Sequence, residues 1–355
     1  MSAVSIHAPR GPLLEVTPQG LFCAAGGFHV DPWAPVPQAV ITHGHADHAR
    51  RGSAVYVAAP SALPVLRLRL GGEARLEGLP FGERRRIGEV EVSLHPAGHL
   101  LGSAQVRIEH RGEVWVVSGD YKTDPDPTCE PFEPVRCDTF ITESTFGLPV
   151  FRWPAQAAVL EEIVEWWRGN AAAGRASVVF AYALGKAQRL LAGVDAVTRA
   201  REIGPLVVHG AVRACVDAYR AAGVTLPDVT AATELSRDEL SHALVIAPPL
   251  AQGSPWMRRF PRAATAFVSG WMRLRALRRQ RRVERGFVLS DHVDWPGVLA
   301  AIEATGARRV GVTHGFTAPL ARFLREERGL ETWTLATRFT GEAGAEETAE
   351  EALPA

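Results

Sequence analysis

Short apolar runs separated by glycine and proline occupy the first 150 residues of the chain. Within the runs, apolar and β-branched residues alternate with polar ones or follow one another directly, which is typical of β-strands. Few stretches in this half have the spacing of a long helix. We therefore expect sheets packed face to face, with strands at residues 13–16, 39–42, 55–58, 89–94, 104–109, 114–118 and 139–142.

The pattern changes at about residue 154, where strands begin to alternate with helices. Such alternation is typical of a parallel α/β unit, which we expect between about residues 150 and 280. Its expected helices are 155–168, 186–201 and 211–222, and its expected strands are 177–181, 206–208, 243–247 and 264–268.

The chain after this unit returns to strands, at 286–290 and 309–313, on either side of a helix at 296–305. The tail 341–355 is rich in Glu and Ala and carries no basic residue. Such a segment has too little apolar surface to bury, so we expect it to be disordered.

Length and charge limit the classes of protein that these elements could form. The chain has 355 residues, which indicates two domains or one domain with a large insertion. Its 39 basic and 39 acidic residues exclude a uniformly basic protein, although they allow local basic patches. No apolar run reaches the roughly 18 residues that a membrane span needs, and the first residues do not resemble a signal peptide. We therefore expect a cytoplasmic protein without a membrane partner.

The strongest chemical signal is the segment 42–48, which reads Thr-His-Gly-His-Ala-Asp-His and follows an apolar strand. In an extended segment, His43 and His45 point the same way, and Asp47 and His48 can then face a second direction. Imidazole and carboxylate ligands at this density suit zinc better than manganese or iron. Charged side chains buried here without a metal would be costly.

Three more residues at strand ends could complete the ligands of two ions. His99 lies in a glycine-flanked loop, Asp120 follows the strand 114–118, and His314 follows the strand 309–313. Each residue alone would more often be an ordinary surface or core residue. Together they predict two divalent ions with these ligands: His43, His45, His99 and Asp120 for one, and Asp47, His48, Asp120 and His314 for the other.

This ordered set of motifs resembles the metallo-β-lactamase fold, and in particular its β-CASP nucleases. Asp31 is similar to the acidic residue that opens the motif series and orients the metal loop. Glu143, His292 and His314 match the β-CASP motifs A, B and C in turn. The resemblance implies an αββα sandwich at 1–150 and 286–340, with an inserted α/β β-CASP cap at 151–285.

Three stretches look most like the bacterial ligase-associated DNA exonucleases of this family. They are Thr-Glu-Ser-Thr-Phe-Gly at 142–147, the segment 182–188 and the segment 290–295. This resemblance implies a metal-dependent exonuclease that acts on DNA from the 5′ end during repair, with a DNA ligase and a helicase as partners. A histidine at motif C is typical of the RNA enzymes, so His314 leaves an RNA nuclease open.

The expected chemistry is hydrolysis of a phosphodiester bond. Two ions that share Asp120 would hold a hydroxide for attack on phosphorus and stabilise the charge that develops on the phosphate oxygens. His292 is the candidate proton donor to the leaving oxygen, held by Glu143. The alternative for these two residues is a structural ion pair between lobes. We also expect Asp47 to be essential for catalysis as a metal ligand.

Four residues in loops are candidates for binding the substrate. Lys186 lies in the strand-to-helix segment 182–188, where backbone N–H groups could bind a phosphate. Ser144, Thr145 and Ser269 occupy similar loops. The alternative is that the segment merely turns the chain and that the lysine is solvated.

Seven arginines occupy residues 273–285, close in sequence to Trp271 and Trp295. A basic groove beside an aromatic platform suits single-stranded nucleic acid, whereas a solvated helix face is the equally good alternative.

Two further functions from other classes are open to the chain. A small-molecule hydrolase of the same fold, such as a thioesterase or lactonase, would not need the cap with Glu143 and His292. A scaffold subunit without activity should have lost metal ligands, and none of the expected ligands is missing.

Overall fold

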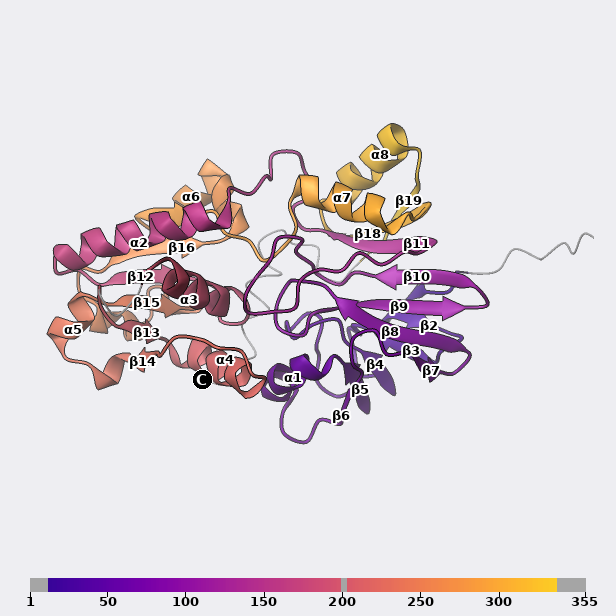
Figure 1. Ribbon diagram of the computed structural model, residues 1–355, viewed down its shortest axis with the longest axis horizontal. Helices are drawn as coiled ribbons and strands as arrows, with labels where there is room; N and C mark the ends of the chain where they lie inside the picture. Colours follow the sequence, from indigo (N-terminus) through magenta and orange to yellow (C-terminus); the bar gives the residue numbers. More distant parts are fainter. Residues whose placement is uncertain (1–11, 199–202, 337–355) are drawn as a thin grey trace, which may run out of the picture.

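We describe a computed structural model of the chain, over residues 12–198 and 203–336. The expected disordered tail at 341–355 lies outside these residues. Two lobes lie side by side, with the strands of the first half in one and the α/β segment in the other (Figure 1). Within the described ranges, no helix is long and apolar enough to cross a membrane.

The first lobe contains two sheets, and their strands come from both ends of the chain. The first sheet has the order β1-β2-β3-β4-β5-β6, and the second has the order β19-β18-β11-β10-β9-β8-β7. The strands of the first sheet are Glu15–Thr17, Gly20–Cys23, Phe28–Val30, Gln38–Val40, Val55–Ala58 and Leu76–Gly78. Those of the second, from β7, are Arg85–Ile87, Val90–Pro96, Ala104–His110, Glu113–Val117, Thr139–Ser144, Arg309–Gly315 and Glu331–Thr334.

Three apolar layers hold this lobe together. One lies between the two sheets and includes Val40, Val92 and Trp115. The outer face of the first sheet packs against α1 (Leu63–Leu70), and that of the second against α7 (Trp295–Thr305) and α8 (Thr317–Arg328). The expected αββα sandwich is therefore confirmed.

The second lobe is built on one sheet, whose strands all pair in parallel in the order β14-β13-β15-β12-β16-β17. In chain order, its strands β12 to β17 are Ser177–Phe180, Leu206–Val208, Thr230–Ala231, Leu244–Ala247, Ala264–Val268 and Arg285–Phe287. Its helices α2 to α6 are Gln156–Ala172, Lys186–Val197, Gly210–Ala221, Arg237–Ser241 and Arg275–Gln280. The expected α/β cap is thus present.

One strand of the cap differs from its expected place. The run at 286–290 was expected to open the return to the first lobe, but β17 pairs with β16 and so belongs to the cap sheet. Arg285 is the first residue of β17, which ends at Phe287, so the chain returns to the first lobe after Phe287.

Parallel pairing in the second sheet brings distant residues to one edge. β11 pairs in parallel with β10 on one side and with β18 on the other, so that Glu143 lies opposite Thr313. Parallel strands present their carboxyl ends at the same edge of a sheet. The loop after β10, the end of β11 and the end of β18 therefore lie together, facing the cap.

Candidate metal centre

Three imidazoles and one carboxylate form the first ligand group. His43 Nε2 and His99 Nε2 each lie 3.2 Å from His45 Nδ1. Asp120 Oδ2 lies 3.5 Å from His43 Nε2 and 4.0 Å from His99 Nε2. All four side chains were expected to bind the first ion, and the structure brings them together.

The hydrogen bonds of two of these rings determine where their protons are. His45 Nε2 lies 3.3 Å from the Leu184 carbonyl oxygen, and His99 Nδ1 lies 2.9 Å from the Asp291 carbonyl oxygen. A carbonyl oxygen only accepts, so each ring must carry its proton on that nitrogen. His45 Nδ1 and His99 Nε2 then face each other with lone pairs and no proton between them. A cation bound by both nitrogens removes this repulsion, so the group fits a metal.

Burial keeps these imidazoles in the neutral form that binds metals. It acts together with neighbouring imidazoles to lower the pKa of His43 and His45 well below the usual value of 6.5. The same causes lower the pKa of His99 to about 3 and that of His314 to about 4. These side chains therefore need no deprotonation at neutral pH before they bind an ion.

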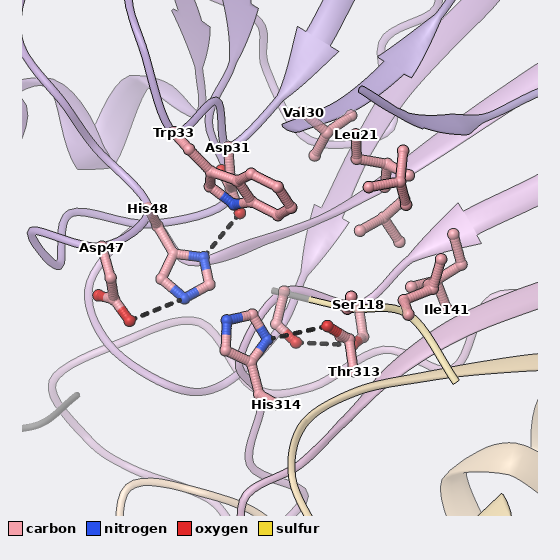
Figure 2. A pocket seen from close by; sticks show the side chains of 15 residues that line it. Leu21, Val30, Asp31, Trp33, Asp47, His48, Ser118, Ile141, Thr313 and His314 are labelled. Carbon is pink, nitrogen blue, oxygen red and sulfur yellow. Dashed lines mark hydrogen bonds and ion pairs between the residues drawn. The ribbon is translucent and has the colours of Figure 1, made fainter. Parts of the chain in front are cut away.

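Asp47, His48 and His314 form the second ligand group, and Figure 2 shows the three side chains pointing toward one another. His48 donates from Nδ1 to Asp31 over 2.7 Å, which leaves its Nε2 buried without a hydrogen-bond partner. This nitrogen lies 3.6 Å from Asp47 Oδ2 and 3.5 Å from Asp120 Oδ2. A buried imidazole nitrogen without a hydrogen-bond partner, beside two carboxylates, fits a second cation in place of a proton, and Asp120 lies within reach of both groups.

The carboxylates around His48 also perturb its pKa. Burial favours the neutral ring, but Asp47, Asp120 and Asp31 outweigh it and raise the pKa of His48 to about 10. Burial raises the pKa of Asp120 to about 7, although His48 opposes the shift. A divalent cation between them would replace the protons that both groups otherwise hold.

Asp31 orients the loop that carries the ligands. Its carboxylate accepts hydrogen bonds from the Thr42 backbone N–H over 2.8 Å and from the Thr42 hydroxyl over 2.5 Å. Gly119 packs so closely against Thr42 that a Cβ there would lie 2.6 Å from the threonine Cβ, and its φ is +58°. The approach of the two loops therefore needs glycine at this position.

Several known proteins are similar in sequence to this chain. A protein named "Probable DNA ligase" from Opitutus terrae is 31% identical over 319 residues, which cover 89% of this chain and 30% of that protein. "Endoribonuclease ysh1" from Aspergillus fumigatus is 26% identical over 197 residues, which cover 53% of the chain and 22% of that protein. "RNase J-like protein" from Methanocaldococcus jannaschii is 26% identical over 137 residues, which cover 38% and 32%. The chain spans about a third or less of these relatives.

The chain belongs to the β-CASP group of the metallo-β-lactamase fold. No family model matches it. A crystal structure titled as a protein of unknown function from Enterococcus faecalis V583 has a TM-score of 0.53 to it at 11% identity, covering 85% of this chain and 79% of that one. That likeness supports the fold alone.

Glu143 and His292, the carboxylate and imidazole expected as motifs A and B, meet beside Asp120. His292 Nδ1 lies 2.9 Å from Glu143 Oε2, and Glu143 Oε1 accepts the Tyr121 backbone N–H over 2.8 Å. Burial opposes the charge on Glu143, but His292 and these hydrogen bonds outweigh it and lower its pKa to about 2. The pair is therefore an ionised carboxylate that holds one nitrogen of an imidazole next to the metal ligands.

The expected substrate residues lie near this pair but are largely engaged with the protein. The Ser144 hydroxyl donates to the His314 carbonyl oxygen, and the Thr145 hydroxyl donates to Glu143. Ser269 is buried, and its hydroxyl accepts from the Trp271 backbone N–H. Lys186 is buried and pairs with Asp291 over 3.3 Å, so the solvated lysine of the alternative interpretation is wrong.

The arginine segment 273–285 exposes most of its basic side chains on the cap. Six of its seven arginines are exposed, and they lie on α6 and in the segments directly before and after it. Its one acidic residue, Glu284, pairs with Arg175 over 2.8 Å. The expected aromatic platform is wrong, because Trp271 and Trp295 are buried against other aromatic rings. A basic surface remains, without the tryptophans.

Two residues of the site were not expected from the sequence. The Leu184 and Asp291 carbonyl oxygens bind the imidazoles of the first ligand group. A backbone carbonyl leaves no signal in residue type, so Leu184 could not have been found. The only hint for Asp291 was its place beside His292.

Proposed function

We propose that this protein is a metal-dependent DNA exonuclease that hydrolyses phosphodiester bonds from the 5′ end. The observation that carries the proposal is the Glu143–His292 pair beside two ligand groups, with Asp120 of the first group 3.5 Å from His48 of the second. Two cations in such a pair of sites favour in-line displacement at phosphorus. The long match to a protein named as a probable DNA ligase favours DNA over RNA.

Different residues of the chain bind the metal ions and donate the proton. When bound, two divalent ions, most simply zinc, supply Lewis acidity to the phosphate and lower the pKa of water. Asp47 and the other candidate ligands would hold these ions. His292 is oriented by Glu143 and donates a proton to the leaving oxygen. The ionised Glu143 carboxylate accepts from His292 Nδ1 and so stabilises the imidazolium before that transfer.

The basic surface at 273–285 supports a polyanionic substrate. The segment begins three residues after Gly270, which packs on Phe146, and the Phe146 ring centroid lies 5.9 Å from that of His292. Arg273, its first residue, donates to the Val150 carbonyl over 3.4 Å. Exposed arginines bind phosphates irrespective of sequence. A strand that leaves the metal centre can therefore follow this face of the cap. Ser144, Thr145, Lys186 and Ser269 remain proposed residues of the terminal phosphate site, although their polar atoms also bond within the protein.

The repair role, with a ligase and a helicase as partners, rests on the same relative and on the sequence resemblance. The proposed cap runs from residue 151 through Phe287, and the first lobe comprises the rest of the described chain.

An RNA nuclease of the same architecture is the second candidate. Histidine at motif C and relatives named endoribonuclease and RNase J-like favour it. The two candidates share every metal ligand and differ only in substrate.

A matched assay separates them. Zinc-loaded protein would be given DNA and RNA strands of equal length, labelled at either end, with and without a 5′-phosphate, beside an Asp47→Ala control. We expect stepwise shortening of DNA from the 5′ end that the control lacks. Preferential RNA cleavage would establish the second candidate, and cleavage by neither would refute both.

A further inference from the structure

A turn of the cap reaches into the metal centre of the other lobe. The Leu184 carbonyl oxygen lies 3.3 Å from Nε2 of His45, a ligand 139 residues earlier in the chain. Gln188 holds this turn from both sides, because its Oε1 accepts the Gly185 N–H over 2.8 Å and its Nε2 donates to the Ala183 carbonyl over 2.9 Å. The orientation of the His45 ring therefore depends on the cap.

A second ligand depends on the cap through a buried ion network. The Asp291 carbonyl oxygen holds His99 Nδ1 at 2.9 Å, and its carboxylate pairs with Lys186 at 3.3 Å and with Arg189 at 3.4 Å. Both cations belong to α3 of the cap, and all three side chains are buried. Arg189 also donates to the Ser290 carbonyl and to Gln156. The segment that orients His99 is thus anchored to the cap helix.

Charges at such depth are costly unless their partners stay in place. The ion pairs of Lys186 and Arg189 with Asp291 therefore favour one position of α3 relative to the turn at 290–292. Residues that orient the ligands of a metal commonly change its affinity 10- to 100-fold when they are replaced.

We propose that the cap is a structural part of the first metal position. The Leu184 carbonyl and the Lys186–Asp291–Arg189 network hold His45 and His99 in the orientation that binds the ion. Lys186 and Arg189 are then positioning residues, and metal affinity depends on how the cap is seated. The inference rests on the metal centre of the proposed function but not on its substrate.

The test measures zinc binding, which is independent of nuclease activity. Zinc affinity at both positions would be determined by competition with a chromophoric chelator for the wild type, Lys186→Met, Asp291→Asn and Gln188→Leu. Arg322→Met is the matched control, because Arg322 forms an exposed pair with Glu326 on α8, far from the cap. Circular dichroism and thermal melts of the metal-free variants would show that each is folded.

We expect one of the two zinc ions to bind 10- to 100-fold more weakly in the three variants, and the control to match the wild type. Cobalt in place of zinc should show an altered d–d spectrum in the same variants. Zinc affinities within twofold of the wild type, together with lower melting temperatures, would mean that the network only joins the lobes and would overturn the proposal.

A variant that does not fold would be replaced by Lys186→Met combined with Asp291→Leu, which removes this ion pair as a whole, while Arg189 keeps Asp126 as a carboxylate partner at 3.5 Å. Wild-type zinc affinity in this folded double variant would likewise overturn the proposal. If the zinc-loaded wild type cleaved neither DNA nor RNA while the variants bound zinc more weakly, the result would contradict only the proposed function.

Discussion

Each imidazole of the first ligand group has one nitrogen bound to an oxygen of the protein, and this determines what its other nitrogen can do. Thr42, Leu184 and Asp291 supply these oxygens to His43, His45 and His99 in turn. The remaining nitrogens converge as lone pairs on one point. His292 differs from these three rings, because the oxygen that bonds its Nδ1 belongs to the carboxylate of Glu143. A neighbouring carboxylate favours the protonated form of an imidazole.

This difference predicts the effect of removing the proton donor. His292→Ala should lower kcat on nucleic acid by about 10²- to 10⁴-fold, the usual contribution of a general acid, while zinc content stays at the wild-type level. Steady-state kinetics and metal analysis on the same preparation would check it. Full activity in this variant would contradict the assignment of His292 as the proton donor.

The low pKa of Glu143 predicts a pH dependence of stability. Its pKa is about 2 in the folded protein and near 4.5 in the unfolded chain, so its contribution is fully present above pH 4.5 and is lost as pH falls toward 2. The free energy of unfolding of the metal-free wild type should therefore fall more steeply over this range than that of Glu143→Gln, by a few kcal/mol. Urea titrations at several pH values would measure both. Parallel curves would refute the prediction, and Glu326→Gln is an exposed control.

At the scale of elements, the candidate metal ligands lie at the ends of strands, whereas exposed arginines lie on α6 and in the segments beside it. The exposed arginines of 273–285 lie on a short helix with flanking turns, where nothing buries them. Such charges bind phosphates through release of counterions, so their effect on affinity should depend on salt and not on sequence.

Three glutamines in place of Arg275, Arg279 and Arg282 should weaken nucleic-acid binding equally for all sequences. Each lost phosphate contact should reduce the slope of log K against log salt by about 0.7 to 0.9. Binding titrations at several salt concentrations would check it. The matched control is Arg322, Arg325 and Arg328 replaced together on α8, and an equal loss there would show that only net charge matters.

The sequence was most informative where a pattern has one physical cause. Alternating apolar runs predicted β5 at Val55–Ala58 and β16 at Ala264–Val268 with their observed limits. The helices α1 and α8 were missed, since prolines near their starts and the arginines along them obscure the apolar face. The strands β2, β3, β6, β7, β14 and β19 were missed because their short segments show little alternation.

In the candidate site too, the sequence indicates what depends on residue type and not what depends on packing. The candidate ligands could be singled out because their residue types suit metal binding, and the structure brings them together in two neighbouring groups. The burial of Lys186 and the carbonyl at Leu184 depend on how the two lobes pack, and no local pattern records that packing. The buried state of Trp271 likewise comes from Phe146, a residue of the other motif region.

At the scale of the whole molecule, the ligand groups join parts of the chain that are otherwise far apart. Asp47 and His48 belong to the loop after β4, whereas His314 lies at the end of β18 on the facing sheet. An ion at this position links the two sheets of the sandwich. Metal binding should therefore stabilise the folded state as a whole.

Removal of metal should lower the melting temperature by about 5 °C or more, since a ligand at 100 times its Kd contributes about 2.7 kcal/mol. Thermal melts with and without excess chelator would check it. The shift should shrink in Asp47→Ala, which loses a ligand of the second group. An unchanged melting temperature in the wild type would show that the ions do not join the sheets.

The pairing of β11 with β18 has a consequence for how the protein is made. Glu143 faces Thr313 across this pair, although the ribosome must add the whole cap between them, which takes roughly 10 to 30 s at typical rates of synthesis. Until then, one side of β11 is an open sheet edge, which is a template for aggregation. Chains that stop before Arg309 would keep that edge open, so we expect them to precipitate during expression instead of yielding a smaller folded fragment.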